Sequence, residues 1–412
     1  MKRKVVITGI GVLTPVGNSK EEMWDSLCNG RSGAGLVTHF DVSKYSSKIA
    51  AQVKNFDAIK YGISKKDDTR LEVFIKFAVA ASVEAVKDSG LDFSSMDPNI
   101  TGVVVGSGIG GIYFIEKQID IVREKGPGKI SPFTVPLMIV DMAAGQVAIH
   151  HGVRGPNLCV ATACATGAHA IGEATRIIQH GDAEVMIAGG TEYATSPIGF
   201  GGFCAARALT TRNDEPEKAS RPFDRDRDGF LMGDGAGIVV LESLEHAIKR
   251  NANIYAEVAG YGMSGDAYHI TCPMPDGEGA TRAMKAALSD AHINGEQVEY
   301  INAHGTSTKI NDAAETAAIK RLFGDYAYKI PISSTKSMMG HLLGAAGSVE
   351  AAICALTIKN GIIPPTINYE NKDPECDLDY VPNIAREKKV SIVLTNSLGF
   401  GGHNATLILK KV

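Results

Sequence analysis

Short apolar runs alternate with stretches of helical periodicity along nearly the whole chain, and this alternation restricts the fold more than any other feature. The run Lys4–Thr8 reads as a strand, and in Arg70–Lys87 apolar residues recur at helical spacing. Later runs such as Gly102–Val105 and Glu184–Ala188 are short and mostly apolar. Strands of this kind are typical of parallel sheets covered by helices on both faces. The pattern therefore predicts an α/β fold.

The same order of elements restarts in the last part of the chain, which predicts an internal duplication. Ile254–Gly260 resembles the opening strand, and the chain ends on Ala405–Lys410 as the first part ends on Gly237–Leu241. With 412 residues, the chain is long enough for two domain-sized halves. We expect these halves to be residues 1–256 and 257–412. Two similar halves packed together would place a site at their interface.

Composition excludes several classes of protein. The 42 Lys and Arg against 46 Asp and Glu give a net charge of −4, so no basic field favours nucleic acid or an anionic membrane. The 7 cysteines contain no C-x-x-C pair, which argues against a disulfide framework or a zinc ribbon. The longest weakly polar stretch, Leu342–Ile358, carries Glu350 and two glycines, so we expect no membrane span. With no signal or transit pattern, we expect a cytoplasmic protein with reduced thiols.

Cys164 stands where a strand-like run turns into a helix. Leu158–Ala161 precedes it, Ala165–His180 follows it, and its neighbours are small. This arrangement resembles a nucleophile elbow, and a thiol at a helix N-terminus feels the positive end of the helix dipole, which favours thiolate. A buried core cysteine, as we interpret Cys159 and Cys354, is the alternative.

Two histidines have comparable surroundings. His304 follows a strand in Asn302–Thr308, and His341 precedes a helix in Lys336–Gly347. Glycine and threonine beside an imidazole leave room for a substrate. Each histidine alone would more often cap a helix or pack in the core, but with Cys164 they make the thiol-plus-imidazole set expected for acyl transfer.

A glycine-rich run, Asn396–Asn404, joins two strands near the C-terminus and contains Phe400. Glycines there permit positive φ and close backbone approach, so exposed N–H groups could meet an oxyanion. A tight hairpin turn explains the glycines but not the phenylalanine among them.

Three other motif matches fail. Gly106–Gly111 satisfies G-x-G-x-x-G, but no suitably placed acid on a second strand would bind a ribose. Asp224–Gly229 fits the first half of a calcium loop, but position 12 is Gly235 instead of glutamate. No histidine pair has the H-E-x-x-H spacing of a zinc hydrolase.

The motifs taken together resemble those of the β-ketoacyl-[acyl-carrier-protein] synthases of the thiolase-like superfamily, and most of all the bacterial type II synthases (KAS II). The similar segments run nearly end to end: Val6–Gly11, Ala163–Gly167, Arg221–Phe230, His304–Thr308, Lys336–His341 and Gly399–Gly402.

This resemblance implies a fold of duplicated βαβαβαββ halves in a five-layered α-β-α-β-α sandwich, usually as a homodimer. It also implies the reaction. Cys164 would take an acyl group from acyl carrier protein (ACP), and malonyl-ACP would then lose CO₂ and attack the thioester. His304 and His341 would hold the enolate, and the N–H groups of Cys164 and Phe400 would meet the oxyanion. No cofactor is required.

The resemblance assigns further residues. Lys336 would belong to the active-site network, with its charge offset by Glu315, which we count among the substrate-binding residues. Phe400 would act as a gate. The remaining substrate-binding residues would be Thr306 and Thr308 on the phosphopantetheine arm and Ile109 and Phe203 along the acyl pocket.

Two expectations concern binding elsewhere. A structural monovalent cation would lie near Asn302, Glu350 and Asn396. Because ACP is acidic, a local basic patch should bind it despite the net charge of −4. The candidates for this patch are Lys65, Lys66, Arg70 and Arg207.

Other functions stay open at this point. A KAS I-type or polyketide ketosynthase would share these motifs. A non-catalytic subunit related to chain-length factors would lack the nucleophile, and a degradative thiolase would use a second cysteine as base. An initiating synthase would show Cys-His-Asn instead of Cys-His-His, so the sequence favours elongation. Acyl chain preference is not predicted.

Overall fold

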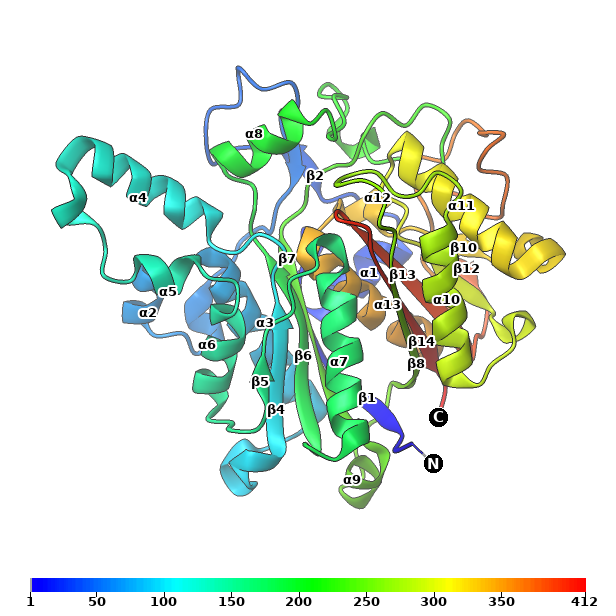
Figure 1. Ribbon diagram of the computed structural model, residues 1–412, viewed down its shortest axis with the longest axis horizontal. Helices are drawn as coiled ribbons and strands as arrows, with labels where there is room; N and C mark the ends of the chain where they lie inside the picture. The colour runs from blue at the N-terminus through cyan, green and yellow to red at the C-terminus, as the bar shows by residue number, and fades with distance from the viewer. Residues whose placement is uncertain (1) are drawn as a thin grey trace.

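One sheet of ten strands runs through the protein in a computed structural model, which describes residues 2–412 (Figure 1). The strand order is β10-β9-β13-β14-β8-β1-β7-β6-β4-β5. The two central strands, β1 (Val5–Leu13) and β8 (Ala256–Gly265), pair antiparallel at Val6 with Glu257 and Ile7 with Ala256. The predicted division after residue 256 therefore falls at the start of β8, where the two halves of the sheet meet.

The two halves of the sheet have the same topology, which confirms the predicted duplication. From the centre outward, the first half runs β1, β7 (Gly235–Ser243), β6 (Val185–Glu192), β4 (Thr101–Gly106) and β5 (Asn157–Leu158). The second half runs β8, β14 (His403–Lys410), β13 (Ile392–Gly399), β9 (Tyr300–Asn302) and β10 (Ile332–Ser333). In each half the first two pairings are antiparallel and the last two are parallel.

Helices complete five layers, as the resemblance implied. α3 (Val73–Ser89) and α6 (Met142–His151) cover the outer face of the first half of the sheet, and α10 (Glu278–Ala291) and α11 (Lys309–Phe323) lie on the second half. Between the two halves of the sheet, α7 (Thr166–His180) packs against α13 (Ala346–Asn360). Apolar side chains from both central helices and both halves of the sheet share one core cluster. This central layer carries the turns that hold the site.

The remaining elements lie around this framework. The other helices are α1 (Lys20–Cys28), α2 (Lys65–Arg70), α4 (Ile112–Lys125), α5 (Thr134–Met138), α8 (Pro197–Ala205), α9 (Leu244–Lys249) and α12 (Lys336–Met339). Two small antiparallel pairs join β2 (Ala34–Leu36) to β3 (Ile49–Ala51) and β11 (Ile362–Ile363) to β12 (Arg386–Glu387). Within residues 2–412, none of the helices has the length and apolar character needed to cross a membrane.

Candidate active site

Two equivalent sharp turns begin the central helices. In the first half, the 3₁₀ turn η5 (Ala163–Ala165) leads into α7, and in the second half η9 (Leu343–Ala345) leads into α13. The first residue of each turn is left-handed, with φ of 49° at Ala163 and 48° at Leu343, a conformation that costs a non-glycine residue energy. The middle residues are Cys164 in one turn and Gly344 in the other. The structure thus forms the turn that the sequence predicts at Cys164, and repeats it in the other half.

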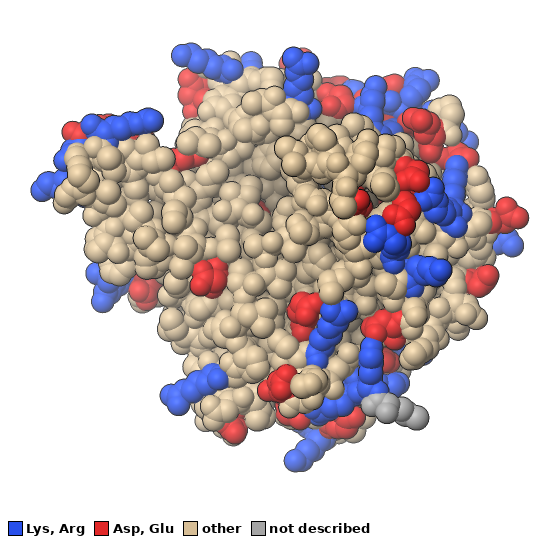
Figure 2. All heavy atoms as spheres, in the orientation of Figure 1, with Lys and Arg blue, Asp and Glu red and all other residues tan. Residues whose placement is uncertain are grey.

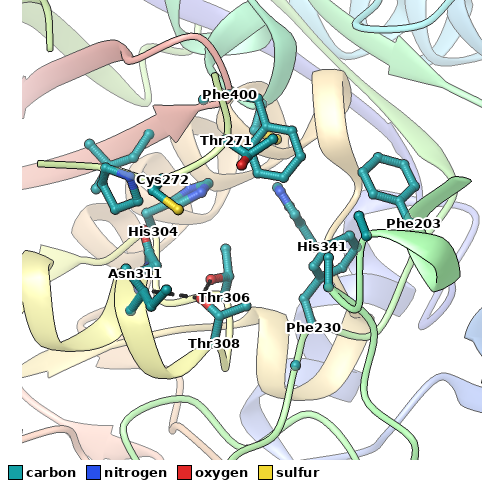
Figure 3. Close-up of a pocket in the computed structure, with 18 of the residues that line it drawn as sticks. Phe203, Phe230, Thr271, Cys272, His304, Thr306, Thr308, Asn311, His341 and Phe400 are labelled. Atoms are coloured by element: carbon teal, nitrogen blue, oxygen red, sulfur yellow. Dashed lines mark hydrogen bonds between the residues drawn. The ribbon is translucent and has the colours of Figure 1, made fainter. Parts of the chain in front are cut away.

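A cavity of about 520 Å³ brings Cys164 together with both predicted histidines. Figure 3 shows the rings of His304 and His341 pointing into the same space beside Phe400. The lining includes aromatic and aliphatic side chains, namely Phe203, Phe230, Leu343 and Leu398. It also includes polar side chains, namely Thr306, Thr308 and Asn311. Residues that lie far apart in the sequence therefore surround one space.

The two imidazoles are neutral. Their ring centroids lie 5.1 Å apart with an angle of 87° between the planes. Burial and the nearby charge of Lys336 lower the pKa of both histidines well below the usual range. The Nδ1 atoms of both are buried without a hydrogen-bond partner among the described residues. Each neutral ring carries one N–H, so the pair can donate two hydrogen bonds to a developing anion.

The Cys164 thiol is protonated at rest, contrary to the expectation that the helix dipole favours thiolate. The residue is 8% exposed, and burial raises the pKa of its thiol to about 12. The charge of Lys336 and the nearby backbone N–H groups of Phe400 and Cys164 lower the pKa of the thiol, but burial outweighs them. The helix N-terminus therefore acts in the expected direction, but burial dominates because the turn encloses the sulfur in apolar surroundings.

The same two N–H groups are the donors that an oxyanion would need. The strand end at Gly399 lies so close to the Cys164 turn that a Cβ on Gly399 would come 2.7 Å from the carbonyl oxygen of Thr162 and 3.2 Å from the nitrogen of Cys164. Only glycine allows this approach. It brings the N–H of Phe400 to the sulfur, beside the N–H of Cys164 itself.

Lys336 forms its salt bridge with Glu350 of α13, and the predicted pairing with Glu315 is wrong. Both members of the observed pair are buried. Glu315 instead accepts hydrogen bonds from the backbone N–H groups of His304 at 2.9 Å and Gly305 at 2.8 Å, and it does not line the cavity. It therefore holds the backbone of the His304 loop in place and is not placed to bind substrate.

The remaining predicted substrate-binding residues divide into two groups. Thr306, Thr308 and Phe203 line the cavity, and the two threonine hydroxyls lie 3.0 Å apart. Ile109 does not line it but packs in the apolar cluster that contains Cys164. The ring centroids of Phe203 and Phe400 are 6.2 Å apart, so these two aromatic side chains of the cavity lining are neighbours.

The three predicted cation ligands do not form one set of side chains. The Asn302 oxygen accepts a hydrogen bond from Thr395, whereas the neighbouring Asn396 points to the opposite face of the sheet, where its amide donates to Glu315 at 3.2 Å. On the Asn302 side, Glu350 Oε2 is buried without a hydrogen-bond partner among the described residues. Ser397 Oγ, which faces the start of α13 near Gly347, is buried and unpartnered in the same way.

Of the predicted basic residues, only Arg207 lines the cavity. Lys65, Lys66 and Arg70 are exposed on α2, which lies beside α5 in Figure 1, and the Arg70 guanidinium is 5.7 Å from the centre of the Phe133 ring. Their role stays a prediction.

Sequence reasoning missed several residues of the cavity. Lys309 and Asn311, at the start of α11, and Cys272 line it. Lys309 directly follows the His304–Thr308 segment, so its place in the chain was the available signal. Phe230 belongs to a segment that carried the family resemblance, but nothing in its spacing indicated an aromatic wall. Cys272 has no such sequence signal.

Comparison with known protein families agrees with this geometry. Residues 2–247 match the family described as "Beta-ketoacyl synthase, N-terminal domain", and residues 255–370 match "Beta-ketoacyl synthase, C-terminal domain". Among curated proteins, the chain is 54% identical to 3-oxoacyl-[acyl-carrier-protein] synthase 2 of Coxiella burnetii, over 100% of this chain and 99% of that one. It is 52% identical to the Synechocystis sp. protein of the same name, over 100% and 98%.

Solved structures show the same fold. A β-ketoacyl synthase from Burkholderia phymatum is 35% identical with a TM-score of 0.93, and both chains are covered completely. A type II polyketide ketosynthase bound to its acyl-carrier protein and a hexaketide is 35% identical with a TM-score of 0.92, again over both full chains. Two matched family domains, full-length relatives above half identity and a shared fold lead to one conclusion: this chain belongs to the β-ketoacyl synthase family.

Proposed function

We propose that this protein is an elongating β-ketoacyl-ACP synthase of fatty acid biosynthesis, which joins an acyl group to a malonyl unit by decarboxylative Claisen condensation. One observation carries the proposal: the Cys164 thiol and two neutral imidazoles face one cavity, and the backbone N–H groups of Phe400 and Cys164 lie beside the sulfur.

The first step is transfer of the acyl group to Cys164. The sulfur attacks the thioester carbonyl of acyl-ACP, a tetrahedral oxyanion forms, and the carrier's thiol leaves with the proton that Cys164 gives up. The N–H groups of Phe400 and Cys164, which lie beside the sulfur in the resting protein, would then donate hydrogen bonds to the oxyanion. One donor of this kind typically raises the rate about 10²–10³-fold. The result is an acyl thioester on Cys164.

The second step forms the carbon–carbon bond. Malonyl-ACP loses its carboxylate as CO₂, and the electron pair passes to the thioester as an enolate. The N–H groups of His304 and His341 would stabilise the enolate oxygen, and they suit this task because both rings are neutral. The enolate carbon then attacks the acyl-Cys164 carbonyl, and the bond between that carbonyl and the sulfur breaks. β-Ketoacyl-ACP leaves, and the Cys164 thiolate takes up a proton from solvent, which restores the resting thiol.

Fatty acid synthesis is favoured over polyketide synthesis by the degree of similarity. The relatives at 52–54% identity are named 3-oxoacyl-[acyl-carrier-protein] synthase 2, whereas the polyketide ketosynthase is 35% identical. A non-catalytic subunit is disfavoured because Cys164, His304 and His341 all line the cavity.

ACP is the partner that this reaction requires. Arg207 and Lys309 lie on the cavity lining, where an acidic carrier would meet their charges. The deeper Thr306 and Thr308 would then bind the phosphopantetheine arm that carries the acyl group.

A second copy of the chain is the other proposed partner. Within residues 2–412, the outermost strand β5 has a pairing partner on one side only. Exposed apolar side chains lie on it, on α6, and on α5 and the residue before it, namely Leu158, Ile149, Val135 and Phe133. Figure 2 shows that charged side chains lie mostly around the margin of this face of the molecule, whose central part is largely uncharged. Such a surface suits a homodimer interface.

No cofactor enters the proposed reaction. For the structural cation, the unpartnered oxygens of Glu350 and Ser397 beside α13 are suitable ligands, whereas the side chain of Asn396 is not. Bound there, a monovalent cation would satisfy buried oxygens and would take no part in a chemical step.

Replacing the nucleophile tests the proposal. Cys164→Ala should abolish β-ketoacyl-ACP formation from acyl-ACP and malonyl-ACP while the protein stays folded, and the matched variant Cys159→Ala should keep its activity. His304→Ala and His341→Ala should each slow CO₂ release from malonyl-ACP by about tenfold or more. Product formation by Cys164→Ala at the wild-type rate would reject the proposed function.

A further inference from the structure

A buried carboxylate outside the catalytic set joins the two halves beside the cavity. Glu192, at the end of β6, is 0% exposed. Its Oε1 accepts hydrogen bonds from Ser107 Oγ at 2.7 Å and the N–H of Ile109 at 3.2 Å. Its Oε2 accepts from the N–H groups of Gly108 at 2.8 Å and Gly344 at 3.0 Å. Three donors come from the first half and one from the second.

The segments held by Glu192 both border the site. The loop 107–111 carries Ile109, which packs in the apolar cluster with Cys164, Phe203 and Leu343. Gly344 is the middle residue of the turn η9, directly after Leu343 of the cavity wall. Ser107 Oγ also accepts a hydrogen bond from the N–H of Gly110 at 2.9 Å, so the carboxylate and one hydroxyl fix the whole loop.

The two segments are in backbone contact. A Cβ on Gly344 would come 2.4 Å from the nitrogen of Gly108 and 2.8 Å from Glu192 Oε2. Without the carboxylate, three N–H groups and a hydroxyl in this dry, tight space would lose their acceptor. Because buried donors seldom stay unpaired, the loop would have to move to satisfy them.

We propose that Glu192 is a positioning residue that fixes the wall of the acyl pocket and thereby determines how well long acyl chains are accepted. The inference rests on the proposed function. Ile109 lies outside the cavity lining but packs in the apolar cluster that contains Cys164 and Leu343, so only an acyl chain longer than the cavity would reach it, whereas a short chain would end before it. Movement of the 107–111 loop should therefore lower the acceptance of long acyl chains more than that of short ones.

The test is the acyl-length profile of Glu192→Gln. The glutamine keeps the shape of the side chain but places an NH₂ group against the N–H donors. We expect kcat/KM for the longest acyl-ACP that the wild type extends to fall about tenfold, while kcat/KM for a short acyl-ACP stays within about twofold. A purely structural role would lower both values equally, together with the melting temperature.

Glu72→Gln is the matched control. Glu72 is also buried, and it accepts a hydrogen bond from the N–H of Phe74 at the start of α3, away from the cavity lining. This variant should leave the length profile unchanged. Should Glu192→Gln not fold, Ser107→Ala removes one donor and should shift the ratio of long-chain to short-chain kcat/KM in the same direction, by about twofold.

An unchanged ratio in folded Glu192→Gln, or in Ser107→Ala if the first variant does not fold, overturns the inference while the wild type is active. If the wild type forms no product from any acyl-ACP, the proposed function fails and the inference fails with it. The two failures are distinguished by the wild-type reaction in the same assay.

Discussion

The reactivity of the Cys164 sulfur depends on the groups around it, because burial of the thiol opposes its ionisation. Burial raises the pKa of the thiol to about 12, and the opposing contributions of Lys336 and the two backbone N–H groups are smaller. Little thiolate is therefore present at neutral pH. The N–H groups do more for the transition state, where negative charge moves from sulfur to oxygen, than for the resting thiol.

The rate of Cys164 alkylation should follow this pKa. A thiol whose pKa is raised is protonated below it, so the thiolate fraction grows about tenfold per pH unit until pH approaches the pKa. We expect alkylation by iodoacetamide, followed by mass spectrometry of the Cys164 peptide, to rise in this way from pH 7 to pH 9 without levelling off. A free cysteine, with an ordinary pKa of about 8.5, should level off near pH 9 in the same experiment. A plateau for Cys164 below about pH 8 would contradict the buried-thiol account.

At the scale of elements, the site depends on how closely the end of β13 approaches the turn before α7. Gly399 makes this approach without a side chain, and the N–H of the next residue, Phe400, reaches the sulfur as a result. The Cys164 sulfur and the N–H of Phe400, the proposed nucleophile and one proposed oxyanion donor, thus come from different halves and are brought together by this backbone contact.

Gly399→Ala should therefore slow acyl transfer. The new Cβ would come 2.7 Å from the carbonyl oxygen of Thr162, so the strand end would have to shift and carry the Phe400 N–H away. Loss of one oxyanion donor should lower the rate of Cys164 acylation by about 10²–10³. Gly35→Ala in β2, where a Cβ meets no atom within 4 Å, is the control and should acylate normally. Normal acylation by Gly399→Ala, measured by rapid quenching and intact mass, would show that the close approach is not required.

Elements also show what the sequence could and could not predict. The helical periodicity over Arg70–Lys87 predicted α3, which runs from Val73 to Ser89, because that signal is local, and the turn at Cys164 was predicted from small residues in a row. The strand predicted at Leu158–Ala161 is shorter and lies at Asn157–Leu158, because pairing with β4 ends there. Lys336 pairs with Glu350 instead of Glu315 because the fold places α13 beside α12. Local sequence patterns do not predict which helices become neighbours.

At the scale of the whole molecule, the exposed edge of the sheet at β5 is the feature that suggests a second chain, because backbone hydrogen-bonding groups of an edge strand lack strand partners there. β5 pairs on one side only, and Leu158 on it is 39% exposed. Open strand edges beside apolar surface favour pairing with another chain. The proposed homodimer would close this edge, and it would extend the sheet across two molecules.

Leu158→Asp should weaken this association. Because an aspartate would place a charge in the apolar contact of the proposed interface, the free energy of association should become less favourable by at least about 1 kcal/mol. We expect wild-type protein to elute with about twice the chain mass of 43.6 kDa in size-exclusion chromatography with light scattering, and the variant to shift towards the single-chain mass on dilution. The control variant Ile384→Asp changes an exposed apolar residue outside this surface, and it should elute with the same mass as the wild type. A wild-type mass of one chain at all concentrations would contradict the proposed dimer.

The two equivalent turns, η5 and η9, differ at their middle residue, which is Cys164 in the first half and Gly344 in the second. The duplicated topology alone does not require this difference. Where one half presents a thiol, its counterpart is a glycine, and any side chain at Gly344 would collide with the backbone of Gly108. Steric exclusion, and not merely sequence divergence, thus prevents the second half from acquiring an attacking group of its own. In the proposed reaction, a chain built from two near-copies would in this way carry one growing acyl chain at a time, and its second half would supply the histidines for the other substrate.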